Sequence, residues 1–117
     1  MTVMRDVPEL NYIVLTGQMI EKGDLKSSSY GIFVIRFKLE NTLSYSAGRA
    51  EESKKTYVIS AEAWGELAER IDRSISNGMY ILLEGNLVSR SYEDRSKGLH
   101  HRMIVKATNV MALGSGS

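Results

Sequence analysis

Two aromatic side chains and one cation in the second half of the chain have the types and spacing needed to bind flat ligands. Trp64 ends one expected strand, and Arg90 and Tyr92 end another strand after an intervening helix. Aromatic rings stack on the faces of nucleobases, and a guanidinium group contacts phosphate or stacks as well. We therefore predict that this part of the chain forms a sheet face for unpaired nucleobases.

Lysine and arginine residues near these positions could neutralise the phosphates of a nucleic-acid strand. Two of them, Arg36 and Lys38, share one face of an expected strand. Further cations stand in expected loops, at Lys54, Lys55, Arg95 and Lys97. Contacts between such groups and phosphates would make the binding affinity fall with salt.

The total charge of the chain gives no argument for a phosphate ligand, because it is only +1 and the pI is about 8.0. The distribution of the charges is more informative. Carboxylates gather on and just before the expected helix, at Glu62, Glu66, Glu69 and Asp72. We predict a basic face opposite an acidic one.

The sequence offers little for catalysis or metal binding. It has no cysteine, which excludes disulfides, thiolate nucleophiles and cysteine zinc sites. His100 and His101 would point to opposite faces of a strand, and no third histidine exists to complete a site. Glu84, Glu93 and Asp94 have no paired base or nucleophile. We predict a protein that is not an enzyme and that needs no metal or cofactor.

Length and composition indicate one domain, since 117 residues with 43% hydrophobic content can bury one core but hardly two. We expect an N-terminal extension over residues 1–9, one domain over 10–113, and a flexible end or linker scar over 114–117. No apolar run approaches the roughly 20 residues of a membrane span, and the first eight residues lack the layout of a signal peptide. A cytoplasmic location is therefore expected.

Hydrophobic alternation predicts strands over residues 10–20, 31–39, 55–64, 79–91 and 99–113. Leu67, Ile71 and Ile75 recur at four-residue spacing and predict a helix over 65–75, which ends before Asn77 and Gly78. Five strands with a helix between the third and the fourth is the order of the OB fold. This all-β fold with one helix forms a partly closed five-stranded barrel, whose open face and loops bind oligonucleotides or oligosaccharides.

The same alternation predicts which side chains face the core. The inward sets are Ile13, Leu15 and Met19; Phe33, Ile35, Phe37 and Leu39; Tyr57, Ile59, Ala61 and Ala63; and Met103, Val105 and Ala107. The open face receives Val34, Arg36, Lys38 and Glu40 from the second strand, and Val58, Ser60, Glu62 and Trp64 from the third. Gly17 predicts a bulge or bend, and Gly85 a break in the fourth strand.

Two segments without this alternation predict loops. Residues 42–54 have no period and should form a mobile loop long enough to be functional. Residues 93–98 are polar and should form a hairpin loop.

Four short segments occur in order on these elements: NYIVLTG at 11–17, AWGELAE at 63–69, LEGNL at 83–87 and SRSYED at 89–94. Together they resemble the bacterial single-stranded DNA-binding protein (SSB) family over nearly all of residues 10–113. The resemblance implies that Tyr45, Trp64 and Tyr92 stack bases and that Arg90 contacts a phosphate or another base. It also implies non-catalytic, largely sequence-independent binding of single-stranded DNA in replication, recombination and repair, at the nucleoid.

The family resemblance also implies partners. SSB proteins form homotetramers as dimers of dimers, and the regular edge of the expected first strand, residues 12–18, could pair with a second copy. Full-length members recruit replication and repair proteins through an acidic C-terminal tip. This chain ends at residues 114–117 without such a tip.

The sequence departs from the family at the expected third strand, where a large aromatic is usual and Val58 stands here. Tyr57 is one residue out of phase, so either a bulge realigns it or this stacking surface is absent.

The short C-terminus leaves three explanations: a chain trimmed to its core, a natural tailless paralogue, or the dimeric primosomal replication protein N branch. FKLE at 37–40 and MIV at 103–105 resemble that branch, whereas AWGELAE favours SSB proper. A primosomal scaffold with auxiliary DNA binding is therefore the alternative function. An oligosaccharide-binding OB domain is a third, and it predicts binding that is indifferent to salt.

Overall fold

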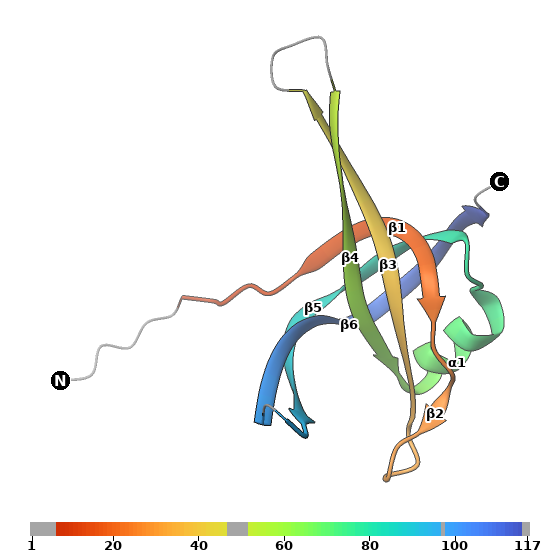
Figure 1. The fold of residues 1–117 in the computed structure, drawn as a ribbon. Helices are drawn as coiled ribbons and strands as arrows, with labels where there is room; N and C mark the ends of the chain where they lie inside the picture. The colour runs from red at the N-terminus through yellow and green to blue at the C-terminus, as the bar shows by residue number, and fades with distance from the viewer. Residues whose placement is uncertain (1–6, 47–51, 97, 116–117) are drawn as a thin grey trace.

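The computed structural model describes residues 7–46, 52–96 and 98–115. Its elements in chain order are β1 (Ile13–Lys22), β2 (Lys26–Ser27), β3 (Phe33–Ser46), β4 (Glu52–Trp64), α1 (Gly65–Ser74), β5 (Met79–Asp94) and β6 (Gly98–Ser115) (Figure 1). Because β2 has only two residues, the five long strands and the single helix follow the predicted order. The helix lies between the third and the fourth long strand.

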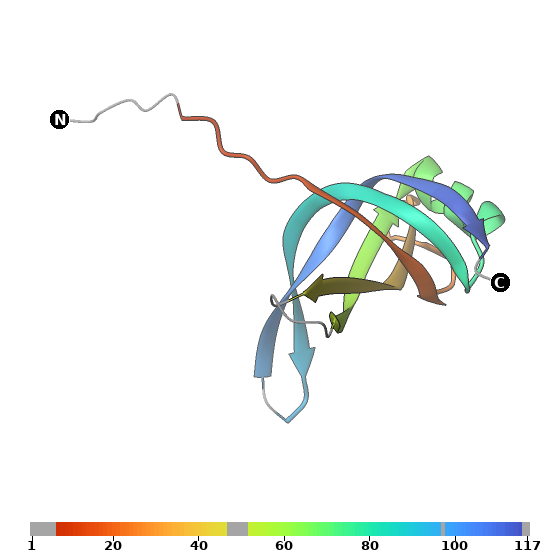
Figure 2. The same ribbon diagram turned by 90° about the horizontal axis from the view of Figure 1, so that it is seen from above.

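The long strands form a closed barrel with the order β1-β5-β6-β4-β3, and β3 pairs again with β1. Closure depends on β1, which pairs with β5 over residues 13–18 and with β3 over residues 18–22. Figure 2 shows the resulting curl of the sheet from above. The predicted OB-fold barrel is therefore confirmed.

Gly17 lies where β1 passes from one partner strand to the other. It is buried, and a Cβ atom there would lie 2.8 Å from the carbonyl oxygen of Glu40. The close approach of β3 therefore accounts for this glycine. The register irregularity between β1 and β3 falls slightly later, between Met19 and Glu21.

The core contains most of the side chains that alternation predicts. It comprises Met19, Ile35, Phe37, Leu39, Ala61, Ala63, Ala68, Ile71, Ile75, Ile81, Leu83, Val105, Ala107 and Val110. Four of the predicted faces were wrong. Phe33 and Tyr57 were expected in the core but are 37% and 47% exposed. Val34 was expected on the open face but is buried, because it pairs with Trp64 on one side and with Lys26 on the other. Met103 was expected in the core but is 56% exposed, because β6 projects beyond the barrel there.

The helix covers one end of the barrel and packs mainly against β3. Ala68 and Ile71 are buried on its inner face, and Ile75 closes its C-terminal end. Gly78 adopts a φ of 96° shortly after the helix, a left-handed conformation that favours glycine, and the helix ends before it as predicted. Among the described residues, no helix is long and apolar enough to cross a membrane.

The mobile loop predicted for residues 42–54 was largely wrong. β3 continues to Ser46 and β4 begins at Glu52, and their pairing runs without a register shift out to the pair Ser46–Glu52. The two strands form an arm that extends away from the barrel (Figure 1). This arm packs against no core, so its residues need no alternation of apolar and polar side chains. The absence of alternation in residues 42–54 therefore indicated that these residues are not buried, and it did not indicate a loop.

The long hairpin of β5 and β6 is the second projection. β5 is not broken at Gly85: it continues from Met79 to Asp94, with a register irregularity between Glu84 and Gly85. The turn is shorter than the predicted loop, because β5 reaches Asp94 and β6 starts at Gly98. Figure 2 shows the hairpin bending away from the barrel.

Candidate nucleic-acid interface

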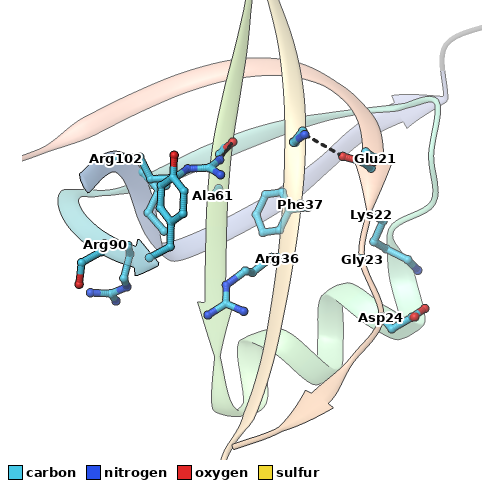
Figure 3. Close-up of a pocket in the computed structure, with 14 residues that line it drawn as sticks. Glu21, Lys22, Gly23, Asp24, Arg36, Phe37, Ala61, Arg90 and Arg102 are labelled. Carbon is cyan, nitrogen blue, oxygen red and sulfur yellow. Dashed lines mark hydrogen bonds and ion pairs between the residues drawn. The ribbon is translucent and has the colours of Figure 1, made fainter. Parts of the chain in front are cut away.

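A groove of about 650 Å³ lies between the β5–β6 hairpin and the turn that follows β1, with β3 and β4 as its floor (Figure 3). These are the strands and loops with which OB folds bind their ligands. The lining residues are Glu21, Lys22, Gly23, Asp24, Arg36, Phe37, Lys38, Ser60, Ala61, Arg90, Ser91, Tyr92, Arg102 and Ile104. Four of the predicted site residues, Arg36, Lys38, Arg90 and Tyr92, are therefore together in one place.

Arg36 and Lys38 project from β3 into the groove because they alternate with the buried Ile35, Phe37 and Leu39. The Lys38 ammonium lies 3.2 Å from the Glu21 carboxylate, and both side chains are about half exposed. An exposed ion pair of this kind contributes little stability, so a phosphate could replace Glu21 as the partner of Lys38.

Arg90 and Trp64 meet at one buried carboxylate. Glu62 is 0% exposed, and its oxygens accept hydrogen bonds from Arg90 Nε at 3.0 Å, Arg90 Nη2 at 2.6 Å and Trp64 Nε1 at 2.5 Å. Burial alone would raise the pKa of Glu62. The hydrogen bonds from Arg90 and Trp64, with the positive charges of Arg90 and Arg36, outweigh burial and hold this pKa below its ordinary value.

Glu62 was predicted to lie on the open face. It was also grouped with the acidic residues on and just before the helix, as part of an acidic face opposite the basic one. The structure separates it from Glu66, Glu69 and Asp72 and places it among the cations. The same contact raises the pKa of Arg90, first through the hydrogen bond to Glu62. A carboxylate therefore lies among the cations of this surface, and the composition of the chain could not indicate its role.

Tyr92 forms part of the groove wall and stacks on a second ring. Its centroid lies 5.2 Å from that of His100, with an interplanar angle of 23°. The two residues are paired across β5 and β6, and Tyr92 remains 49% exposed. His100 therefore supports one face of the tyrosine ring while much of the ring stays accessible.

Other predicted site residues lie away from this groove. Trp64 does not line it but is joined to it through Glu62. Lys54 and Lys55 are exposed on the β3–β4 arm, and Arg95 is exposed in the β5–β6 turn. Lys97 lies outside the described residues. The backbone of Tyr45 pairs with Ser53 in the arm, but its side chain is outside the described part.

Two cations of the groove were missed by the sequence analysis. Arg102 donates a hydrogen bond to Ser60 Oγ at 2.8 Å and lies opposite Arg90 in the hairpin register. That register would have revealed Arg102 if the turn had been centred on Ser96. Lys22 is less available, because its ammonium donates to the carbonyls of Ile75 at 2.8 Å and Asp72 at 3.0 Å.

The register of β3 and β4 settles the question of Tyr57. No bulge realigns it, since the pairing is continuous along β4. Tyr57 therefore lies on the face of β4 opposite that of Val58, Ser60 and Trp64. Val58 is 57% exposed on the groove-side face and offers an apolar surface without a ring.

Comparison with solved structures supports the fold. The structure "Plasmodium falciparum SSB complex with ssDNA" superposes with a TM-score of 0.81 and 18% identity, covering 93% of this chain and 99% of that one. A deletion mutant of the single-stranded DNA binding protein from Thermus aquaticus gives a TM-score of 0.77 and 20% identity, covering 89% of this chain and 50% of that one.

Sequence comparison finds curated relatives that are also named single-stranded DNA-binding proteins. "Single-stranded DNA-binding protein 2" of Streptomyces coelicolor is 27% identical over 85 residues, covering 71% of this chain and 43% of the relative. The "Single-stranded DNA-binding protein" of Treponema pallidum is 27% identical over 112 residues, covering 92% of this chain and 60% of the relative. The chain thus spans about half the length of these relatives. The Single-strand binding protein family matches residues 10–113, and the chain belongs to that family.

Proposed function

We propose that the chain binds single-stranded DNA without catalysis and with little sequence preference, by stacking bases and contacting phosphates. The observation that carries the proposal is the groove in which Arg36, Lys38, Arg90 and Tyr92 meet. Stacking on an aromatic ring contributes roughly 1 to 3 kcal/mol per base, and every base has a face that can stack. Affinity with little sequence preference follows from this arrangement.

The cellular role we infer is to cover unpaired strands at the nucleoid during replication, recombination and repair. The relatives named above support DNA binding as the main activity, whereas the primosomal scaffold receives no support from them. The groove also disfavours an oligosaccharide ligand, because five of its lining residues are arginines or lysines: Lys22, Arg36, Lys38, Arg90 and Arg102.

The first test is a titration of the chain with poly-dT at low and at high salt, with the fluorescence of Trp64 as the signal. This residue is the only tryptophan of the chain, so the signal reports one position. We expect quenching on binding and an affinity that weakens as salt rises. The proposal would be contradicted if poly-dT neither quenched the fluorescence of Trp64 nor competed with a labelled dT oligomer for the chain.

A matched pair of tyrosines tests the groove itself. Tyr92 and Tyr57 are 49% and 47% exposed, but only Tyr92 lines the groove. We expect Tyr92→Ala to weaken binding of a labelled dT oligomer by about 5- to 100-fold, from the loss of roughly 1 to 3 kcal/mol of stacking. Tyr57→Ala should leave the affinity within twofold. Equal losses for both variants would place the DNA elsewhere.

Self-association is the second part of the proposal, as a homotetramer or a dimer. Within the described residues, the segment of β1 from 13 to 15 pairs only with β5, which leaves its other edge for a second copy. The outer face of β1, β5 and β6 also exposes the large apolar side chains Val14, Tyr80, Met111 and Leu113, and Tyr12 is exposed just before β1. An apolar group of this kind is typical of an interface.

Sedimentation equilibrium tests this part directly. We expect the chain to sediment as a dimer or a tetramer at micromolar concentration, and Val14→Glu to shift it toward the monomer, because the charge would enter the apolar interface. Thr108→Glu is a control on an exposed residue outside this apolar set. A wild-type chain that remains monomeric at high concentration would refute self-association.

A further inference from the structure

Glu62 is the only buried charged side chain among the described residues. A carboxylate without water is costly unless hydrogen bonds and an opposite charge compensate it. Here the compensation comes from two flat groups, the Arg90 guanidinium and the Trp64 indole. The position is unusual for a carboxylate, because the surrounding surface is the one we propose for a polyanion.

The partner that Glu62 uses is not the one that the sheet places beside it. Arg36 lies directly opposite Glu62 in the β3–β4 register, where opposite charges commonly pair. The ion pair within 4.0 Å instead joins Glu62 to Arg90, and Arg36 has none within the described residues. Among the described residues Arg36 therefore acts on Glu62 only through its charge and has no ion pair of its own, whereas the charge of Arg90 is neutralised by direct contact.

The geometry of the Arg90 contact leaves its flat surface available. Two nitrogens of one guanidinium edge donate to the two oxygens of Glu62, which fixes the plane of the group. The Arg90 side chain is still 40% exposed. A guanidinium held in this way can stack on a base, and its charge is already satisfied by the carboxylate.

Trp64 is anchored by the same carboxylate. Glu62 and Trp64 are two residues apart on β4 and therefore share a face, and the indole N–H donates to Glu62 Oε2. That hydrogen bond restricts rotation of the ring. One buried acid thus connects two planar groups from two strands, β4 and β5.

We propose that Glu62 is a positioning residue of the DNA groove. It fixes the Trp64 ring and the Arg90 guanidinium as two stacking surfaces, and it cancels the charge of Arg90 so that this residue does not contribute to the salt-dependent part of binding. The inference rests on the proposed function, since it assigns roles within that site. It also separates two kinds of cation in the groove: Arg36 contacts phosphate, and Arg90 contacts bases.

Salt dependence distinguishes these roles, because each phosphate contact on a single strand changes the slope of log K against log salt by about 0.7. Glu62→Gln keeps the shape and most hydrogen bonds but frees the charge of Arg90, so we expect the slope for a dT oligomer to steepen by about 0.7. Glu62→Gln with Arg90→Gln restores the wild-type charge, and the slope should return to the wild-type value. Arg36→Gln is the control and should flatten the slope by about 0.7.

The opposite results would overturn the inference. If Arg90 already contacts phosphate, Glu62→Gln will leave the slope unchanged and the double variant will flatten it by about 0.7. A wild-type chain that binds no dT would refute the proposed function and this inference together. A chain that binds dT but shows the wrong slopes would refute only the role of Glu62.

The positioning of Trp64 has its own readout in time-resolved fluorescence anisotropy. Glu62→Val removes the acceptor, and we expect faster local motion of the indole and at least threefold weaker dT binding at high salt, where stacking dominates. Glu62→Gln should restore slow motion, because its amide oxygen still accepts the indole N–H. Unchanged indole motion in Glu62→Val would refute the positioning of Trp64. If Glu62→Val does not fold, free local rotation of the indole in the wild-type chain would refute it instead.

Discussion

Replacing Gly85 by alanine should destabilise the barrel by about 2 to 3 kcal/mol, at the upper end of what overpacking costs. A Cβ atom at this position would lie 2.2 Å from the carbonyl oxygen of Lys106 and 3.0 Å from Val105 Cγ1. Cβ atoms essentially never approach other atoms within 3.0 Å, so the gap is about 0.8 Å too small. The obstacle is backbone, which cannot rotate away as a side chain can.

The strain would fall where the barrel and the hairpin join. Gly85 pairs with Ile13 of β1 on one side and with Ala107 of β6 on the other, beside the register irregularity of β5. Separating β5 from β6 there would loosen the packing of Leu83, which is fully buried. The hairpin that holds Arg90 would change direction as well.

Urea unfolding followed by Trp64 fluorescence measures the effect. With a slope of about 1.5 kcal/mol/M, the midpoint of Gly85→Ala should fall by roughly 1.3 to 2 M. Gly31→Ala is the control: its φ of 78° is strained for alanine, but nothing lies within 4 Å of the added atom, so we expect a loss of about 1 kcal/mol. A Gly85→Ala midpoint no lower than that of Gly31→Ala would refute the reasoning.

Three further outcomes follow from the described contacts. The pKa of Glu62 is lowered in the folded chain, so the ionised carboxylate stabilises the fold fully above its ordinary pKa of 4.5. This stabilisation is lost as pH falls through the lower pKa of the folded state. Between pH 7 and 3, urea midpoints should therefore fall less steeply in Glu62→Gln than in the wild type. Leu83→Ala should cost about 2 to 5 kcal/mol of unfolding free energy, measured by urea denaturation, because its side chain is fully buried. Val58→Trp should tighten binding of a dT oligomer in an anisotropy titration by at least fivefold, from a new stacking surface worth roughly 1 to 3 kcal/mol, whereas Tyr57→Trp on the other face should not.

The barrel could be predicted from sequence because burial leaves a period. Ile35, Phe37 and Leu39 alternate with charged residues, and the structure buries all three. The same reasoning failed in the β3–β4 arm, where residues 42–46 pair as a strand without any core to cover them. Alternation therefore predicts the strands that enclose a core and misses the ends of strands that leave it.

The candidate site was predictable in part, through the faces of single strands. Arg36 and Lys38 on β3 and Arg90 and Tyr92 on β5 were each placed correctly within their own strand, and the structure brings the two pairs to one groove. The role of Glu62 was not predictable, because it depends on contacts across β4, β5 and the groove. Pairings between distant strands determine which cation a carboxylate neutralises, and a local pattern does not contain them.

The way in which β1 closes the barrel also sets an order of events during synthesis. Ile13 pairs with Gly85, which is made 72 residues later. At about 5 to 20 residues per second, a ribosome needs roughly 4 to 14 s to reach that partner. Throughout this interval the first strand has no β5 to pair with, and its unpaired edge can join a neighbouring nascent chain. The time for which the first strand waits, and not the final stability of the barrel, would then decide how much of the protein is lost to aggregation as it is made.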